Sequence, residues 1–234
     1  MNKNNRVLKV GIVGCGTIAQ IMHLPILREL EGLYKVVALC DVSKKLVQKM
    51  GELYNVRQIY TDYHKMLKET DMDAVIILTP INHSEVAIEA AQRGLHILTE
   101  KPMSISLKEA DEMLIAAKEN RVKLMAAHMR LYNPAYEAAR EIIRGIKDKR
   151  FIRLHTSCGI TGGAPEFINQ VARVYRFDDI PDKVKEEQNI FIEKHLKELT
   201  GLAKAARNLY INILGGAIHD IYVLRGIFGM FTLR

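Results

Sequence analysis

Short apolar runs alternate with amphipathic segments along the first half of the chain. The apolar runs have the length and the β-branched content of buried strands. The amphipathic segments follow helical spacing and carry helix signals: Ser43 precedes one that reaches Tyr54, and Gly94 follows one that begins at Ser84. The strand-like runs are residues 7–13, 36–40, 74–78, 96–99 and 122–128.

Strands that alternate with helices in this way form a parallel sheet with helices on both faces. We therefore expect an α/β fold, a Rossmann-type doubly wound parallel sheet, over residues 1–128. One of its helices should begin at a capping box made by Ser106 and Glu109. The apolar stripe of that helix is formed by Leu107, Ala110, Met113, Leu114 and Ala117.

The pattern changes after residue 128. Tyr132-Asn133-Pro134 interrupts the chain before a helix over residues 135–146, and residues 151–158 alternate like a strand with one exposed face. Residues 159–181 look irregular, a polar helix follows over residues 182–199, and residues 202–228 are helix-like with a bend at Gly215-Gly216. We expect residues 129–234 to form an incomplete α+β second domain, which serves substrate binding and oligomerisation.

The first apolar run leads directly into Gly14-Cys15-Gly16-Thr17-Ile18-Ala19, which has the order of a dinucleotide-binding turn. Gly14 permits the tight turn, Gly16 has no Cβ to keep a pyrophosphate from the backbone, and Ala19 lets the helix pack closely on the strand. The following helix N-terminus favours negative charge. The sequence predicts a phosphate site that includes Thr17 and Ile18.

An acid follows the second strand at the distance that this kind of site requires. Asp41 lies 22 residues beyond Ala19 and suits a carboxylate that accepts hydrogen bonds from the adenosine ribose hydroxyls. This favours NAD over NADP, because a phosphate on that ribose would meet a like charge that only Lys44 and Lys45 offset. Two alternatives remain open: the glycines could form a tight turn without a ligand, and Asp41 could merely cap a helix.

Composition narrows the class of protein. The chain has 234 residues, 48% of them hydrophobic, which is enough for one large or two modest globular domains. Its apolar runs are too short to cross a membrane and its polar start is unlike a signal peptide, so we expect no membrane partner and a cytoplasmic location. Cys15, Cys40 and Cys158 form no Cys-x-x-Cys pair, which argues against disulfides and against a zinc site.

The net charge of +7 is concentrated between Arg140 and Arg153. Such a basic stretch either is a solvated helix face or attracts an anionic substrate. Because it lacks interleaved aromatic residues, we expect no nucleic-acid partner.

Several motifs together resemble the Gfo/Idh/MocA family (glucose–fructose oxidoreductase, inositol dehydrogenase and rhizopine catabolism). The resemblance covers the whole first domain and continues more loosely through Arg130-Leu131-Tyr132-Asn133-Pro134 and 219–225, a stretch similar to the histidine-bearing helix of the family. The motifs in the first domain are the glycine turn, His23-Leu24-Pro25, Thr79-Pro80, His83 and the run from Gly94 to Glu100-Lys101-Pro102.

The resemblance implies an NAD(P)-dependent oxidoreductase that transfers hydride between nicotinamide and a sugar, polyol or related hydroxyl compound. Oxidising an alcohol also requires a group that removes the hydroxyl proton. His219 is the candidate base, because imidazole has a suitable pKa, and by analogy Lys101 orients substrate and cofactor. Arg130 and Tyr132 are candidate substrate contacts, although packing explains them equally well. The implied cofactor contacts are Gly14, Gly16, Thr17, Ile18, Asp41, Thr79, Pro80, His83, Glu100 and Lys101.

The chain departs from the family pattern in its second half. Gly215 and Tyr222 stand where the family commonly has aspartates, and the chain stops at Arg234, where family members continue into a large sheet that commonly builds the oligomer interface. We therefore expect a truncated chain that depends on a partner or is poorly soluble alone, and the resemblance admits a homo-oligomer. Three functions stay open: a dehydrogenase, a non-catalytic cofactor or sugar sensor, and an inactive fragment.

Overall fold

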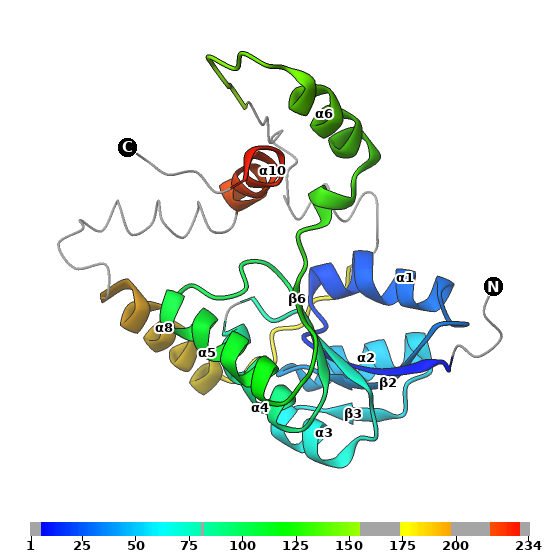
Figure 1. The fold of residues 1–234 in the computed structure, drawn as a ribbon. Helices are drawn as coiled ribbons and strands as arrows, with labels where there is room; N and C mark the ends of the chain where they lie inside the picture. The colour runs from blue at the N-terminus through cyan, green and yellow to red at the C-terminus, as the bar shows by residue number, and fades with distance from the viewer. Residues whose placement is uncertain (1–5, 81, 155–173, 198–215, 230–234) are drawn as a thin grey trace.

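Six parallel strands form one sheet in the order β3-β2-β1-β4-β5-β6 (Figure 1). The computed structural model describes residues 6–80, 82–154, 174–197 and 216–229. The strand order reverses between β1 and β4, as in the doubly wound dinucleotide-binding fold, so the predicted fold class is confirmed. The strands are β1 (Leu8–Val13), β2 (Tyr34–Cys40), β3 (Gln58–Tyr60), β4 (Ala74–Ile77), β5 (His96–Thr99) and β6 (Leu124–Ala126).

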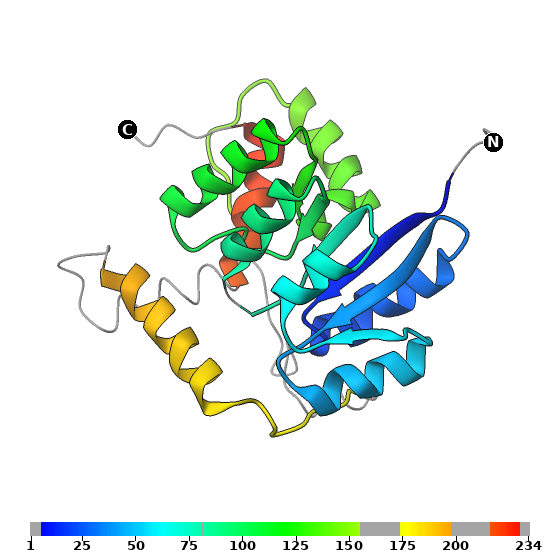
Figure 2. The same ribbon diagram turned by 90° about the horizontal axis from the view of Figure 1, so that it is seen from below.

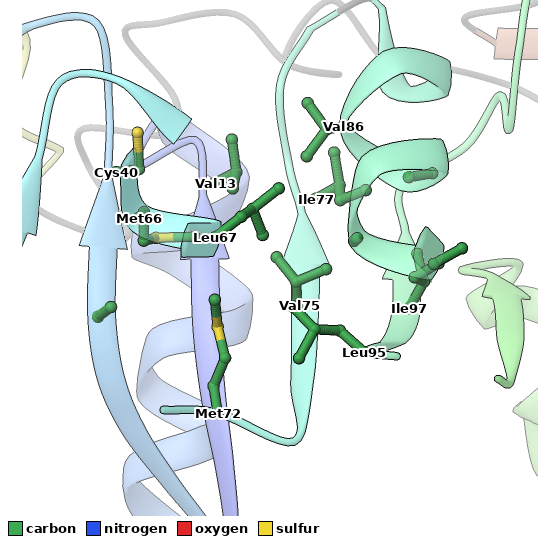
Figure 3. Close-up of a cluster of buried hydrophobic side chains, with 14 of the residues drawn as sticks. Val13, Cys40, Met66, Leu67, Met72, Val75, Ile77, Val86, Leu95 and Ile97 are labelled. Carbon is green, nitrogen blue, oxygen red and sulfur yellow. The ribbon is translucent and has the colours of Figure 1, made fainter. Parts of the chain in front are cut away.

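Helices cover both faces of the sheet, because successive strand residues point to opposite sides. Ile12 packs in a buried cluster with α1 and α2, whereas its neighbour Val13 packs in a second cluster with α3, α4 and α5. Figure 3 shows this second cluster, in which Val75 and Ile77 of β4 meet Val86 of α4. The helices of this part are η1 (Ala19–His23, a π-helix), α1 (Leu24–Glu29), α2 (Lys44–Tyr54), α3 (Tyr63–Glu69), α4 (His83–Gln92) and α5 (Leu107–Glu119).

The predicted capping box at the start of α5 is wrong. Ser106 occupies the N-cap position, but its side chain makes no capping hydrogen bond. Glu109 instead accepts a hydrogen bond from Ser104 Oγ at 3.0 Å and pairs with His195 Nε2 at 2.7 Å. These partners come from the preceding loop and from a distant helix, so they hold Glu109 away from the backbone group that the capping box requires.

The predicted apolar stripe of α5 is also partly wrong. Met113 and Ala117 are buried, but Leu107 is 87% exposed and Leu114 is 53% exposed. Helix α5 packs against its neighbour α4, and its buried residues are Met113, Ala116 and Ala117. The buried strip is therefore narrower than the apolar pattern suggests.

The second half of the chain contributes η2 (Met129–Tyr132), α6 (Pro134–Gly145), α8 (Asp182–Lys197) and α10 (Ile218–Phe228). Helix α10 packs against α6 and η2, with Gly226 facing the Tyr136 hydroxyl so closely that a Cβ would not fit. The expected strand over 151–158 is not formed where it is described, since residues 151–154 are irregular. The rest of this expected strand, including Cys158, lies outside the described residues, and so does Gly215. The domain boundary at residue 128 stays a prediction.

The described residues also show the state of two cysteines, the spread of potential metal ligands and the apolarity of the helices. Cys15 and Cys40 are buried, and neither forms a disulfide. Within the described ranges, no three His, Cys, Asp or Glu side chains gather as a metal site would need. None of the helices described combines the length and apolarity that crossing a membrane demands.

Candidate functional site

The two glycines of the turn after β1 have different structural roles. Gly14 has a φ of +98°, and a Cβ built on it would lie 2.7 Å from the Leu78 carbonyl carbon and 2.9 Å from the Thr79 nitrogen. Gly16 faces open space instead, since no described atom lies within 4 Å of the position that its Cβ would take. Gly14 is therefore required by the fold, while Gly16 leaves room for a group that approaches the backbone, as a pyrophosphate would.

Asp41 is fixed at the carboxyl end of β2 beside this turn. One carboxylate oxygen accepts a hydrogen bond from the Cys15 N–H at 2.7 Å, and the other accepts from the Ser43 N–H at 2.9 Å. Burial raises the pKa of Asp41 and nearby Asp179 adds to this, while the two backbone hydrogen bonds oppose it. These bonds use only part of the acceptor capacity of a carboxylate, which leaves lone pairs for ribose hydroxyls.

His83 joins the loops that follow β4 and β5. Its Nδ1 lies 2.8 Å from the Pro102 carbonyl oxygen and its Nε2 lies 2.6 Å from the Thr79 carbonyl oxygen. The side chain is buried, so it braces the two loops. The side-chain oxygen of Thr79, Oγ1, is buried and has no hydrogen-bond partner among the described residues. It could bond to a polar group of a bound cofactor. Pro80 is exposed beside Thr79.

Glu100 is held at the carboxyl end of β5. His23 Nε2 lies 3.1 Å from one carboxylate oxygen, and the Lys101 N–H donates to the other at 3.2 Å. Burial alone would raise the pKa of Glu100, but the hydrogen bonds from His23 and Lys101 and their charges outweigh it and leave that pKa lowered. The Lys101-Pro102 peptide bond is cis. This arrangement ties η1, which follows the glycine turn, to the loop that carries Lys101.

The structure brings His219 from α10 to the same edge of the sheet. Burial lowers the pKa of His219, and the nearby cations Lys101 and Arg130 lower it further, while Asp220 and Glu100 oppose them. Arg130 Nη1 donates to Asp220 Oδ1 at 2.7 Å, which pins η2 to α10. His219 Nδ1 is buried with no hydrogen-bond partner in the described part of the chain. Residues from the loop after β5, from η2 and from α10 thus lie around one imidazole.

His128 is a further member of this group, and it was not among the predicted site residues. It is buried, and its ring stacks on that of Tyr222 with centroids 3.2 Å apart. Burial lowers the pKa of His128 to about 4, and the neighbouring His219 contributes to this. The sequence could have indicated His128 as a site residue, because it follows β6 and ligand-contacting residues of such sheets gather at the carboxyl ends of the strands.

Three other predicted site residues lie at the surface of this region. Ile18 is 43% exposed at the start of η1, next to half-buried Thr17. Tyr132 is 67% exposed at the end of η2. Their assignments to cofactor and substrate stay predictions.

Comparison with known proteins identifies the family to which this fold belongs. The profile of a family described as "Oxidoreductase family, NAD-binding Rossmann fold" (GFO_IDH_MocA) matches residues 8–128. Relatives include the uncharacterized oxidoreductase YrbE of Bacillus subtilis, 29% identical over 57% of this chain and 39% of that protein. Another is myo-inositol 2-dehydrogenase of Thermotoga maritima, 28% identical over 58% of this chain and 40% of that protein. This chain therefore spans about two fifths of the length of these relatives.

A similar solved structure is that of the WlbA dehydrogenase from Bordetella pertussis in complex with NADH and UDP-GlcNAcA. It superposes with a TM-score of 0.57 and 26% identity, over 59% of this chain and 42% of that one.

Proposed function

The chain belongs to the Gfo/Idh/MocA family of oxidoreductases, which have an NAD-binding Rossmann fold, and from this premise we propose that it acts in an NAD-dependent dehydrogenase. The substrate is a sugar, a polyol or a related hydroxyl compound. The coenzyme lies along the carboxyl edge of the sheet, with its pyrophosphate at Gly16 and its adenosine ribose at Asp41.

The observation that carries this proposal is the group of residues around His219. A base for alcohol oxidation must be unprotonated at the working pH and within reach of the substrate hydroxyl. The pKa of His219 is lowered by burial and by Lys101 and Arg130, so its ring is neutral at neutral pH and can accept a proton. The bound nicotinamide supplies the hydride acceptor.

The other residues of the group position this base and the substrate. Lys101 can donate hydrogen bonds to a substrate hydroxyl, and its charge favours loss of the hydroxyl proton. The ion pair with Asp220 holds Arg130 beside the imidazole. A hydroxylated substrate is supported by the relative named for myo-inositol and by the solved complex with UDP-GlcNAcA.

A coupled substrate screen tests this proposal. The chain is incubated with NAD and panels of polyols, sugars and nucleotide sugars, and the absorbance of NADH is followed. Turnover is expected, and His219→Asn should lower kcat/KM by about 10²- to 10⁴-fold, as loss of a general base does. The NAD-induced thermal shift should survive in this variant, because His219 is assigned to the proton and not to coenzyme binding.

His64→Asn is the matched control, since His64 lies on α3 and pairs with Glu89 away from the site. It should keep wild-type turnover. Binding of NAD without turnover on any member of the panels would overturn the dehydrogenase and favour a cofactor or sugar sensor. Equal losses in His219→Asn and His64→Asn would remove His219 from the chemistry.

A further inference from the structure

A distant segment of the chain returns to the coenzyme edge of the sheet. Gln20 Nε2 donates to the Tyr175 carbonyl oxygen at 3.0 Å, and the Tyr175 N–H donates to Gln20 Oε1 at 2.8 Å. The rings of Tyr175 and Phe177 pack against the buried cluster beneath α1 and α2. Figure 2 shows this segment, in yellow, passing α2 on its way into α8. The segment is thus anchored beside the glycine turn by both hydrogen bonds and apolar contacts.

Asp179 in this segment binds the first turn of α2. Its carboxylate accepts hydrogen bonds from the Ser43 hydroxyl and from the Lys45 N–H, the latter at 2.9 Å. The Ser43 hydroxyl and the Lys45 N–H lower the pKa of Asp179, so the group is charged at neutral pH. A carboxylate is stable there because the first N–H groups of a helix lack partners within the helix and favour negative charge.

Two carboxylates therefore flank Ser43. The Ser43 N–H donates to Asp41 and the Ser43 hydroxyl donates to Asp179. The two acids are close enough to interact, since Asp179 raises the pKa of Asp41. Lys44 and Lys45 are exposed beside these acids, and the charge of Lys45 contributes to the lowered pKa of Asp179.

The two carboxylates should interact differently with NAD and with NADP. The 2′-hydroxyl of NAD is neutral and can donate to Asp41, whereas NADP carries a phosphate at the same ribose position. A phosphate needs hydrogen-bond donors and positive charge around it. The Ser43 hydroxyl and the Lys45 N–H are donors at the start of α2, close behind Asp41 in the chain, and Asp179 already occupies both.

We propose that Asp179 is a coenzyme-specificity residue, which excludes NADP by covering the donors at the start of α2 with a carboxylate. The proposal rests on the coenzyme position given under the proposed function. It assigns discrimination to two acids that are far apart in sequence: Asp41 recognises the ribose hydroxyl, and Asp179 rejects a phosphate in its place.

Calorimetric titration of the 234-residue chain with NAD and with NADP tests this assignment. Asp179→Asn removes the charge and keeps the size of the side chain. It should tighten NADP binding by about tenfold, as expected for one like charge near the phosphate at low salt, and should leave NAD binding within about twofold. Asp178→Asn is the matched control, because this exposed neighbour has the same charge and makes no described contact with α2.

Salt gives an independent measurement on the unaltered chain. Raising the salt to about 0.5 M should narrow the preference of the wild type for NAD, because screening weakens repulsion between exposed charges. The preference of Asp179→Asn should change less. A purely steric role for the segment would leave both preferences insensitive to salt.

Three results would overturn the proposal. Asp179→Asn and Asp179→Ala, of which the second also uncovers the two donors, could both keep the wild-type ratio of affinities while NAD still binds, which refutes the role of Asp179 and leaves the dehydrogenase intact. Asp178→Asn could produce the same gain for NADP, which would assign the effect to net charge. A wild type that binds neither coenzyme would overturn this proposal together with the coenzyme position on which it rests.

Discussion

Replacing each glycine of the coenzyme turn by alanine should separate stability from coenzyme binding. Gly14→Ala places a Cβ against the backbone of Leu78 and Thr79, whereas Gly16→Ala places it in open space. The first variant should therefore unfold at a lower temperature. The second should be slightly more stable than the wild type but should fail to bind NAD.

The expected loss in Gly14→Ala has two sources. The left-handed backbone at a φ of +98° costs a residue with a side chain about 1–2 kcal/mol. The Cβ would also lie 2.7 Å from a backbone carbon, which no side-chain rotation can relieve. A total of about 2–4 kcal/mol is reasonable by comparison with other strained or overpacked sites. For a chain of this size, the unfolding temperature should fall by roughly 5–12 °C.

Gly16→Ala should behave in the opposite way. Its backbone suits any residue and its Cβ meets no described atom, so the smaller entropy of the unfolded chain should stabilise the variant by about 0.4–1 kcal/mol. The added methyl group occupies the space through which the pyrophosphate reaches the backbone. The free energy that bound NAD adds to stability, about 2.7 kcal/mol at a hundredfold excess over Kd, should be lost.

Thermal unfolding of the three proteins with and without NAD measures both effects. The wild type should show an NAD-induced shift of about 5–10 °C, Gly16→Ala should show none, and Gly14→Ala should start from a lower temperature. A full NAD shift in Gly16→Ala would mean that the coenzyme does not approach Gly16. A wild-type unfolding temperature in Gly14→Ala would refute the argument from backbone geometry.

Further predictions concern the charges around the proposed site. Lys101→Met should lower kcat/KM by at least about 100-fold, which steady-state kinetics check. Arg130→Met should raise the pKa of His219 and move the acid limb of the kcat/KM profile to higher pH, because Arg130 lowers this pKa. Asp220→Asn should move the limb to lower pH, because Asp220 raises it. A limb that stays fixed in both variants would show that His219 is not the titrating base. Because the pKa of Glu100 is lowered in the folded chain, ionised Glu100 stabilises the fold at pH values above its unfolded-state pKa of about 4.3. This stabilisation is lost as the pH falls through the folded-state pKa. Calorimetry should therefore find a smaller loss of stability between about pH 5 and pH 3 in Glu100→Gln, and an unchanged slope would contradict this.

Much of the sheet could be predicted from the sequence because its signals are local. Ser43 accepts a hydrogen bond from the Leu46 N–H at 3.0 Å as the N-cap of α2, and Gly94 ends the segment after α4 with a φ of +77°. The short β3 and α3 were not predicted individually, since three residues such as those of β3 are too few to establish a period. The buried strip of α5 depends on α4, so the apolar pattern of α5 alone could not place it.

The site was predictable in part for the same reason. The glycine turn and Asp41 are linked by one supersecondary unit, so their spacing along the chain implies their proximity. The contact between Ser43 and Asp179 spans 136 residues and has no repeating pattern in the sequence. The partners of Glu109 and His23 are likewise polar contacts between elements. Such contacts depend on how distant elements pack, which only the folded chain shows.

The two ends of the proposed coenzyme site carry opposite charge, and this difference has a chemical consequence. At the adenosine end, Asp41 and Asp179 favour neutral hydroxyls over a phosphate. At the other end, Lys101 and Arg130 lie close enough to His219 to lower its pKa. Nicotinamide is a cation in NAD and neutral in NADH, so nearby cations favour the reduced ring. They also keep His219 unprotonated and able to accept a proton, but they oppose the protonated ring that forms when the proposed base takes the hydroxyl proton. In the proposed reaction, the charges around His219 therefore favour hydride transfer to the ring, and they also favour passing the accepted proton from His219 to solvent.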